Sequence, residues 1–295
     1  MTFLEPTPDR EFLPVFSMDW FGLLRKIKQV EGNYGILAPV HCTNNFLHCV
    51  RETGKPFFID RGVFAKNELP WHLQKYAEFK NGFWKREIRL ATEQNLRQNI
   101  AEFFDRCDRF SPDYVFAPDI IGEPLISLYL AHLNLDEYAR KPRTYQLIGV
   151  VQAGASLYNW EGNSVPLVDG FLPHYNSPRC FLAALISEYR RIGYQKISLG
   201  GLLQSRDDTP TGLKFGLSPE GLDELLTWSR PDFVLGGLAL TRIEVLRKHR
   251  VWSDSTNWLW WDARYDKKRF GDRDTMGEVI GKLTTYANDG LEFKS

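Results

Sequence analysis

The chain has 295 residues, and its 37 Lys and Arg balance 37 Asp and Glu. A hydrophobic share of 43% and a charged share of 25% are typical of a globular protein with a substantial core. The balanced charge excludes a global basic field for nucleic acid, although a local basic patch would suffice. No apolar run could span a bilayer and the N-terminus lacks the features of a signal peptide, so we expect a cytoplasmic protein without a membrane partner.

Short runs rich in β-branched and aromatic residues recur along the chain and alternate with stretches of helical spacing. The helical stretches include 93–107, 178–194 and 218–230, the last with Ser218 as N-cap and Pro219 at the first helical position. The strand-like runs are 34–41, 55–60, 113–119, 146–152, 196–202, 232–238 and 250–255.

This alternation predicts parallel strands covered by helices on both faces. Seven runs and one strand not yet identified fit a closed (β/α)₈ barrel, a TIM-like α/β fold, formed by residues 1–295 as a single domain. No GxGxxG follows the first run, which disfavours a Rossmann fold.

Polar residues and glycines stand where the strand-like runs end. They are Asp60, Asp119, Gln152, Gly200, Gly201, Gly236, Gly237 and Asp254. In a barrel these ends meet at one mouth, where active sites of this fold lie. Each residue also has a structural interpretation, because Asp often caps helices or turns and Gly often forms turns. Their recurrence at one end of the strands favours a site, and crowded acids suit acid–base chemistry.

Five of these stretches, in order, resemble the tRNA-guanine transglycosylase family. "FFIDRGVF" resembles the family's "LTDSGGFQ", "DYVFAPDIIG" takes the place of its second acidic strand, "IGVVQAG" resembles "GIVQGG", and "KISLGGL" resembles "YAIGGLAVG". "HRVWSDSTNW" is similar to the nucleophile strand, and most similar to the "SFDSTSW" form of the DpdA-type 7-deazaguanine transglycosylases that modify DNA.

The resemblance implies a role for each matching residue. Asp254 would be the nucleophile and Asp60 the general acid/base, in a double displacement through a covalent aspartyl-glycosyl intermediate. Asp119 and Gln152 would bind the base, with the amides of Gly200 and Gly201 at a base carbonyl oxygen. The implied reaction replaces guanine in a polynucleotide, DNA in preference to tRNA, with a 7-deazaguanine such as 7-cyano-7-deazaguanine, and a helper protein is an expected partner.

Nucleic acid would have to reach the site as a flipped or single-stranded nucleotide. Candidate phosphate contacts are Arg61 and the basic cluster Lys267, Lys268 and Arg269. Solvated helix faces are the ordinary interpretation of three other basic clusters, at 84–89, 189–196 and 246–250. Trp252, Trp258, Trp260 and Trp261 would either stack on the nucleotide or pack the barrel.

The chain also departs from the family. The zinc motif CxCxxC with a following histidine is missing, since no Cys follows Asp254, so we expect a shortened barrel with no metal and no cofactor. The four cysteines lie far apart, as expected of free buried thiols. Two alternatives stay open: a catalytically silent paralogue that binds nucleic acid or another subunit, and a barrel enzyme that acts on free nucleosides or sugars.

Overall fold

The fold was analysed in a computed structural model that describes residues 12–19, 21–28, 31–62, 71–80, 82–153, 178–202, 218–238, 242–255 and 284. Eight strands form a closed barrel in the order β1-β10-β9-β8-β7-β6-β3-β2, and every neighbouring pair is parallel. The predicted (β/α)₈ barrel is therefore confirmed. The strands are β1 (Pro14–Ser17), β2 (Gly35–Pro39), β3 (Phe57–Asp60), β6 (Tyr114–Phe116), β7 (Gln146–Gln152), β8 (Lys196–Gly200), β9 (Phe233–Val234) and β10 (Trp252–Ser255).

Seven of the eight strands lie within the predicted runs, and β1 is the strand that the sequence pattern missed. β1 closes the barrel, because Val15 pairs with Asp254 on one side and with Gly35 on the other. The run that begins at Tyr34 therefore contains the second strand of the barrel.

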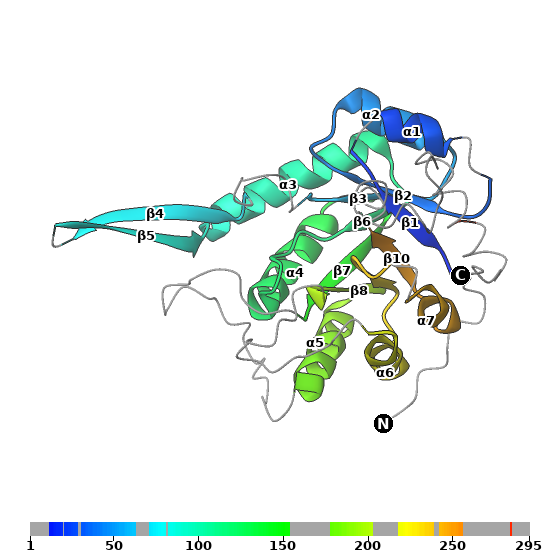
Figure 1. Cartoon of the computed structure of the whole chain (residues 1–295). Helices are drawn as coiled ribbons and strands as arrows, with labels where there is room; N and C mark the ends of the chain where they lie inside the picture. Colours follow the sequence, from blue (N-terminus) through cyan, green and yellow to red (C-terminus); the bar gives the residue numbers. More distant parts are fainter. Residues whose placement is uncertain are drawn as a thin grey trace.

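Helices cover the outside of the barrel (Figure 1). The Ser218 side chain accepts from the Gly221 N–H at 3.1 Å, which confirms it as the N-cap, and Pro219 is the first helical residue. None of the described helices is long and apolar enough to cross a membrane. The helices are α1 (Phe21–Ile27), α2 (Asn44–Arg51), α3 (Glu93–Phe110), α4 (Pro124–Tyr138), α5 (Pro178–Ile192), α6 (Pro219–Ser229) and α7 (Ile243–Lys248).

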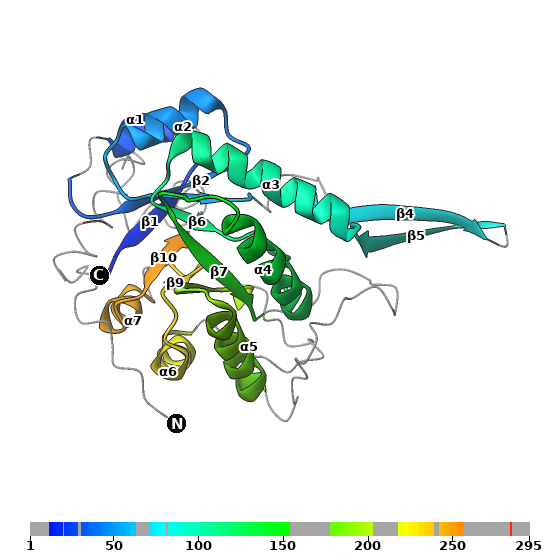
Figure 2. The same cartoon turned by 180° about the vertical axis from the view of Figure 1, so that it is seen from behind.

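A two-stranded antiparallel hairpin interrupts the barrel pattern between β3 and α3. It consists of β4 (Leu73–Lys80) and β5 (Phe83–Leu90), and it projects away from the barrel in both views (Figures 1 and 2). Phe79 and Phe83 lie near its tip with 61% and 79% of their surface exposed. The sequence analysis assigned no element to this segment, although Asn81-Gly82 between two stretches with aromatic residues is a hairpin signal that could have found it.

Aromatic side chains fill the interior of the barrel. Phe58 stacks on Tyr114 with ring centroids 4.8 Å apart and meets Trp252 edge-on at 5.9 Å. Gly35 makes room for this packing, because a Cβ at that position would lie 2.7 Å from the Phe58 ring. The inward-facing apolar cluster comprises Leu13, Val15, Leu37, Phe58, Phe116, Ile148, Val150 and Phe233, as expected for side chains that alternate in and out along barrel strands.

We expect Phe58→Ala to destabilise the fold by about 3–5 kcal/mol, because it leaves a cavity at the centre of the barrel. Urea unfolding followed by circular dichroism measures this change. Phe79→Ala is the matched control, since Phe79 is 61% exposed and its loss should cost less than about 0.5 kcal/mol. Equal effects of the two substitutions would contradict the packing role of Phe58.

Candidate active site

The structure brings the predicted acids to one end of the barrel. Asp60 is the last residue of β3, Gln152 is the last residue of β7, and Asp254 lies in β10. Asp119 follows β6 within the loop that leads to α4. Because all eight strands are parallel, these positions share the carboxyl-terminal mouth of the barrel, where enzymes of this fold carry their active sites.

Asp254 is held by two donors, one on each carboxylate oxygen. The Ser17 hydroxyl donates to Oδ2 at 2.7 Å, and the Gly236 N–H donates to Oδ1 at 2.8 Å. The turn after β9 also bonds the backbone, since the Leu238 N–H donates to the Asp254 carbonyl oxygen at 3.0 Å. Asp254 is only 7% exposed, so its orientation is fixed inside the mouth.

Asp60 is less well satisfied than Asp254. Its Oδ1 is buried and has no hydrogen-bond partner within the described part of the chain, although the Gly62 N–H bonds the carboxylate. Burial raises the pKa of Asp60 to about 7; the charge of Asp254 adds to this increase, while the bond from Gly62 opposes it. Asp60 therefore titrates near neutral pH, where it can both donate a proton as a general acid and accept one.

Asp119 is paired with Gln152 across neighbouring strands. The Gln152 side-chain amide donates to Asp119 Oδ2, and its oxygen accepts from the Gly122 N–H at 3.0 Å. Burial raises the pKa of Asp119 to about 7, the bond from Gln152 opposes the shift, and the charge of Asp60 adds to it. Gln152 is thus bonded within the protein and positions Asp119, while its role in binding a base stays a prediction.

Helix α4 fixes the loop that carries Asp119. The Ser127 hydroxyl bonds both the N–H and the carbonyl oxygen of Ile120, and the Asn134 side chain donates to the Pro118 carbonyl oxygen at 2.8 Å. Ser127 and Asn134 are buried on the inner face of the helix. Two buried polar residues of α4 therefore bond the backbone on either side of Asp119.

The glycines at the strand ends have reasons within the protein itself. A Cβ on Gly200 would lie 2.5 Å from the Gln152 amide nitrogen, so the absence of a side chain at Gly200 leaves room for the Gln152 side chain. Gly201 and Gly236 have φ angles of 74° and 70°, which favour glycine. A Cβ on Gly237 would meet Val234 at 2.6 Å. Contact of Gly200 and Gly201 with a ligand remains a prediction.

Arg61 and Trp252 have internal partners in the structure. The Arg61 guanidinium lies 4.8 Å from the Trp71 ring centroid at the base of the hairpin, and it was predicted to contact nucleic acid. Trp252 packs edge-on against Phe58 and Tyr114, which is the packing alternative for this residue. The Lys196 ammonium group lies over the rings of Tyr114 and Trp252, at the amino-terminal end of the barrel. Other predicted residues lie outside the described part of the chain: Trp258, Trp260, Trp261, Lys267, Lys268 and Arg269.

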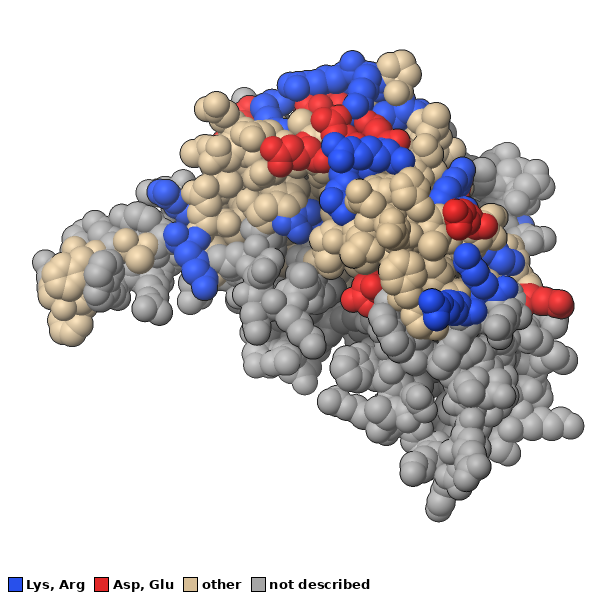
Figure 3. All heavy atoms as spheres, turned by 90° about the horizontal axis from the view of Figure 1, so that it is seen from above, with Lys and Arg blue, Asp and Glu red and all other residues tan. Residues whose placement is uncertain are grey.

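Charges of both signs are mixed on the described surface. Figure 3 shows Lys and Arg interleaved with Asp and Glu on one face of the molecule. Ion pairs join Arg191 to Glu188 at 2.5 Å and Lys248 to Asp223 at 2.8 Å, so two of the predicted basic clusters are partly neutralised. Cys42 and Cys107 are free and buried, as predicted, whereas Cys49 is only half-buried and Cys180 is exposed.

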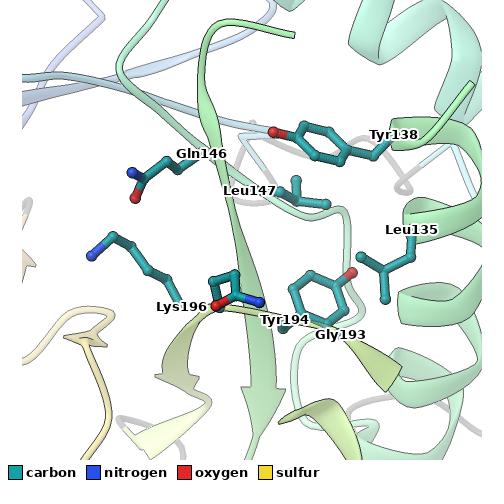
Figure 4. Close-up of a pocket in the computed structure, with 8 residues that line it drawn as sticks. Leu135, Tyr138, Gln146, Leu147, Gly193, Tyr194 and Lys196 are labelled. Atoms are coloured by element: carbon teal, nitrogen blue, oxygen red, sulfur yellow. The ribbon is translucent and has the colours of Figure 1, made fainter. Parts of the chain in front are cut away.

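A separate pocket lies at the opposite end of the barrel from the acids. It has a volume of about 440 Å³ and lies beside the starts of β7 and β8, at Gln146 and Lys196, against the last turns of α4 (Figure 4). Tyr138 and Tyr194 form part of its wall. Their hydroxyls bond backbone carbonyls of Tyr145 and Ala131. The carboxylates do not line this pocket, so we place the candidate site at the other mouth.

Within the described ranges, no group of three or more His, Cys, Asp and Glu side chains is arranged to hold a metal ion. The three acids of the mouth differ in their partners among the described residues: two donors for Asp254, an amide for Asp119 and a buried, unbonded oxygen for Asp60. The pKa values of Asp60 and Asp119 are both raised to about 7, whereas the two donors favour the anionic form of Asp254, so Asp254 suits the role of the anion and Asp60 that of the acid.

Comparison with known proteins gives distant structural likenesses. No family model and no curated protein matches this chain. A structure described as "Native KDPGal structure" matches with 9% identity and a TM-score of 0.43, over 98% of this chain and 100% of that one. The YdjI aldolase from Escherichia coli K12 matches with 8% identity and a TM-score of 0.49, over 93% of this chain and 88% of the aldolase.

These comparisons correct the predicted function. The expected replacement of guanine by a 7-deazaguanine in DNA or tRNA is wrong, because the matching structures are described as KDPGal and as an aldolase rather than as transglycosylases. At such low identity neither likeness transfers a substrate or a reaction to this chain.

We expect Asp60→Asn to stabilise the protein at pH 8. The folded pKa of about 7 lies above the ordinary value of 3.8, so the folded state binds the proton more tightly than the unfolded chain does. The contribution of Asp60 to stability therefore falls as the pH rises from about 4 to about 7. The substitution should raise the free energy of unfolding by up to about 4 kcal/mol at pH 8 and change it little at pH 4, as measured by urea unfolding.

Asp223→Asn is the control with the opposite sign. Hydrogen bonds from Lys248 and His249 lower the pKa of Asp223, so this group contributes stability above its unfolded pKa and loses it as the pH falls. Its substitution should slightly destabilise the protein at pH 8. A destabilised Asp60→Asn at that pH would show that Asp60 is a structural cap.

Proposed function

We propose that this protein is a barrel enzyme that cleaves the glycosidic bond of a small sugar-containing substrate, a free nucleoside or a related glycoside. The single observation that carries the proposal is the carboxylate cluster of the mouth. Asp254 is buried with one donor on each oxygen, and Asp60 has a buried oxygen that no described residue bonds. A fixed anion and a protonated acid are the two groups that glycosidic bond cleavage uses.

In the proposed first step, the Asp254 carboxylate attacks the anomeric carbon and the bond to the base breaks. Asp60 donates its proton to the departing base, and the sugar remains attached to Asp254 as an ester. In the second step, water or a small acceptor attacks the same carbon and gives its proton to the Asp60 carboxylate. The ester bond breaks, and both acids return to their starting states.

The floor of the site supports a small, partly apolar substrate. The inward-facing cluster with Phe58 at its centre lies below the acids along the strands and closes the barrel interior. Asp119, fixed by Gln152, offers a carboxyl group for a hydroxyl or a ring N–H. Burial of these groups also strengthens each electrostatic contact with a bound substrate, because little water screens them.

Asp254→Asn and Asp60→Asn should separate the two roles. We expect Asp254→Asn to lower kcat at least about 10³-fold with every substrate, because it removes the nucleophile. Asp60→Asn should lose about 10²–10⁴-fold with free nucleosides, but much less with a p-nitrophenyl riboside, whose leaving group needs no proton. Turnover of both substrate types, followed by chromatography and absorbance, measures these effects.

Asp223→Asn is the control, because its carboxylate pairs with Lys248 on the surface. It should retain wild-type turnover. Intact mass of the wild-type protein with a slow 2-fluoro glycoside should show one sugar bound at Asp254. Failure of the wild-type protein to turn over any nucleoside or glycoside in the panel would contradict the proposed function.

A further inference from the structure

Ser17 contacts the proposed nucleophile from a strand that lies far away in the sequence. Its hydroxyl donates to Asp254 Oδ2 at 2.7 Å, across a separation of 237 residues. Both side chains are buried, with 6% and 7% exposure. The bond joins β1 to β10, the two strands whose parallel pairing helps to close the barrel.

The position of Ser17 favours an apolar residue on packing grounds alone. Side chains alternate along β1, so Ser17 and Val15 share the inner face, and Val15 belongs to the apolar interior cluster. Burying a hydroxyl there costs free energy unless it forms a hydrogen bond. The bond of Ser17 goes to a carboxylate of the candidate site rather than to the barrel backbone.

Ser253 shows how a buried serine of the neighbouring strand behaves when it serves the backbone. It is fully buried beside Asp254, and its hydroxyl donates to the Val234 carbonyl oxygen at 2.7 Å. Ser253 and Ser17 thus have the same residue type, similar burial and hydrogen bonds of equal length. They differ in the acceptor: a backbone carbonyl for Ser253 and a carboxylate for Ser17.

We propose that Ser17 is a positioning residue that fixes the orientation and the ionised state of the Asp254 carboxylate. Its effect on catalysis rests on the proposed function, whereas its effect on Asp254 does not. An ionised carboxylate only accepts hydrogen bonds, so donors from Ser17 and Gly236 both favour this state. They also fix the carboxylate plane, which leaves the remaining lone pairs pointing in defined directions toward the mouth.

The charged surroundings of Asp254 are simple in the described part of the chain. Asp60, at the end of β3, interacts electrostatically with Asp254. β1 and the turn after β9 contribute the neutral Ser17 hydroxyl and Gly236 N–H. His41, after β2, packs close to Gly62 beside Asp60. Burial raises the pKa of Asp254, and the bonds from Gly236 and Ser17 counteract this increase. Loss of the Ser17 bond should therefore raise this pKa further.

The test compares Ser17→Ala with Ser17→Thr and with the matched control Ser253→Ala. Carbon-13 NMR titration of the substrate-free protein follows the Asp254 carboxyl signal, which is assigned by its absence in Asp254→Asn. Ser17→Ala should raise the Asp254 pKa and move the acid limb of the kcat/KM profile to higher pH. It should also lower kcat about 10–100-fold with little change in KM. Ser17→Thr retains the hydroxyl and should restore the titration.

Ser253→Ala should lower the melting temperature without moving the Asp254 titration, because it removes a backbone bond only. An unchanged Asp254 titration in Ser17→Ala would overturn the positioning role, whatever the activity. A shifted titration supports it even if no glycoside is turned over, and that combination would overturn the proposed function alone. The two proposals therefore fail by different observations.

Discussion

The closure of the barrel by β1 is the constraint on which the rest of the structure depends. β1 pairs with β2 on one side and with β10 on the other, so the two ends of the described chain meet in one sheet. Pairing strands whose residues Ser17 and Asp254 lie 237 positions apart in the sequence carries a large entropic cost, which the buried aromatic interior must offset. Once the ring is closed, the carboxyl ends of all eight strands converge, and no separate element is needed to build the mouth.

The mouth itself works against stability. Three carboxyl groups lie at or near the top of an apolar interior, and burial raises the pKa of each. A protein selected for stability alone would place apolar residues there. The local arrangement reduces this cost unequally: Asp254 has two donors and Asp119 has one side-chain donor, while one oxygen of Asp60 has no partner among the described residues. The two donors favour the anionic form of Asp254, whereas the pKa values of Asp60 and Asp119 are raised to about 7, and acid–base chemistry uses such a pair of anion and acid.

Neighbouring residues hold the acids of the site in place. Gly200 leaves space for Gln152, Gln152 holds Asp119, and Ser127 and Asn134 of α4 hold the loop around Asp119. The turn after β9 contributes both a side-chain and a backbone bond to Asp254. Rigid strand ends with such supporting bonds position reactive groups more accurately than long loops do.

The sequence by itself determined the barrel and the position of its acids along the strands. Periodicity and β-branched runs are local properties, so β7 was predicted to the residue and Asp60, Gln152 and Asp254 were placed at strand ends. Tertiary structure alone decided the closing strand β1, whose four residues include a proline and give a weak local signal. The tertiary structure also decided three contacts. Ser17 donates a hydrogen bond to Asp254, Gln152 donates one to Asp119, and Trp252 packs against Phe58 beneath the site. Hydrogen-bond partners and burial depend on residues distant in the chain, and sequence spacing does not encode them. The resemblance to a known family rested on residue types at strand ends. Barrel enzymes of different chemistry share such residue types, so the resemblance did not determine the reaction.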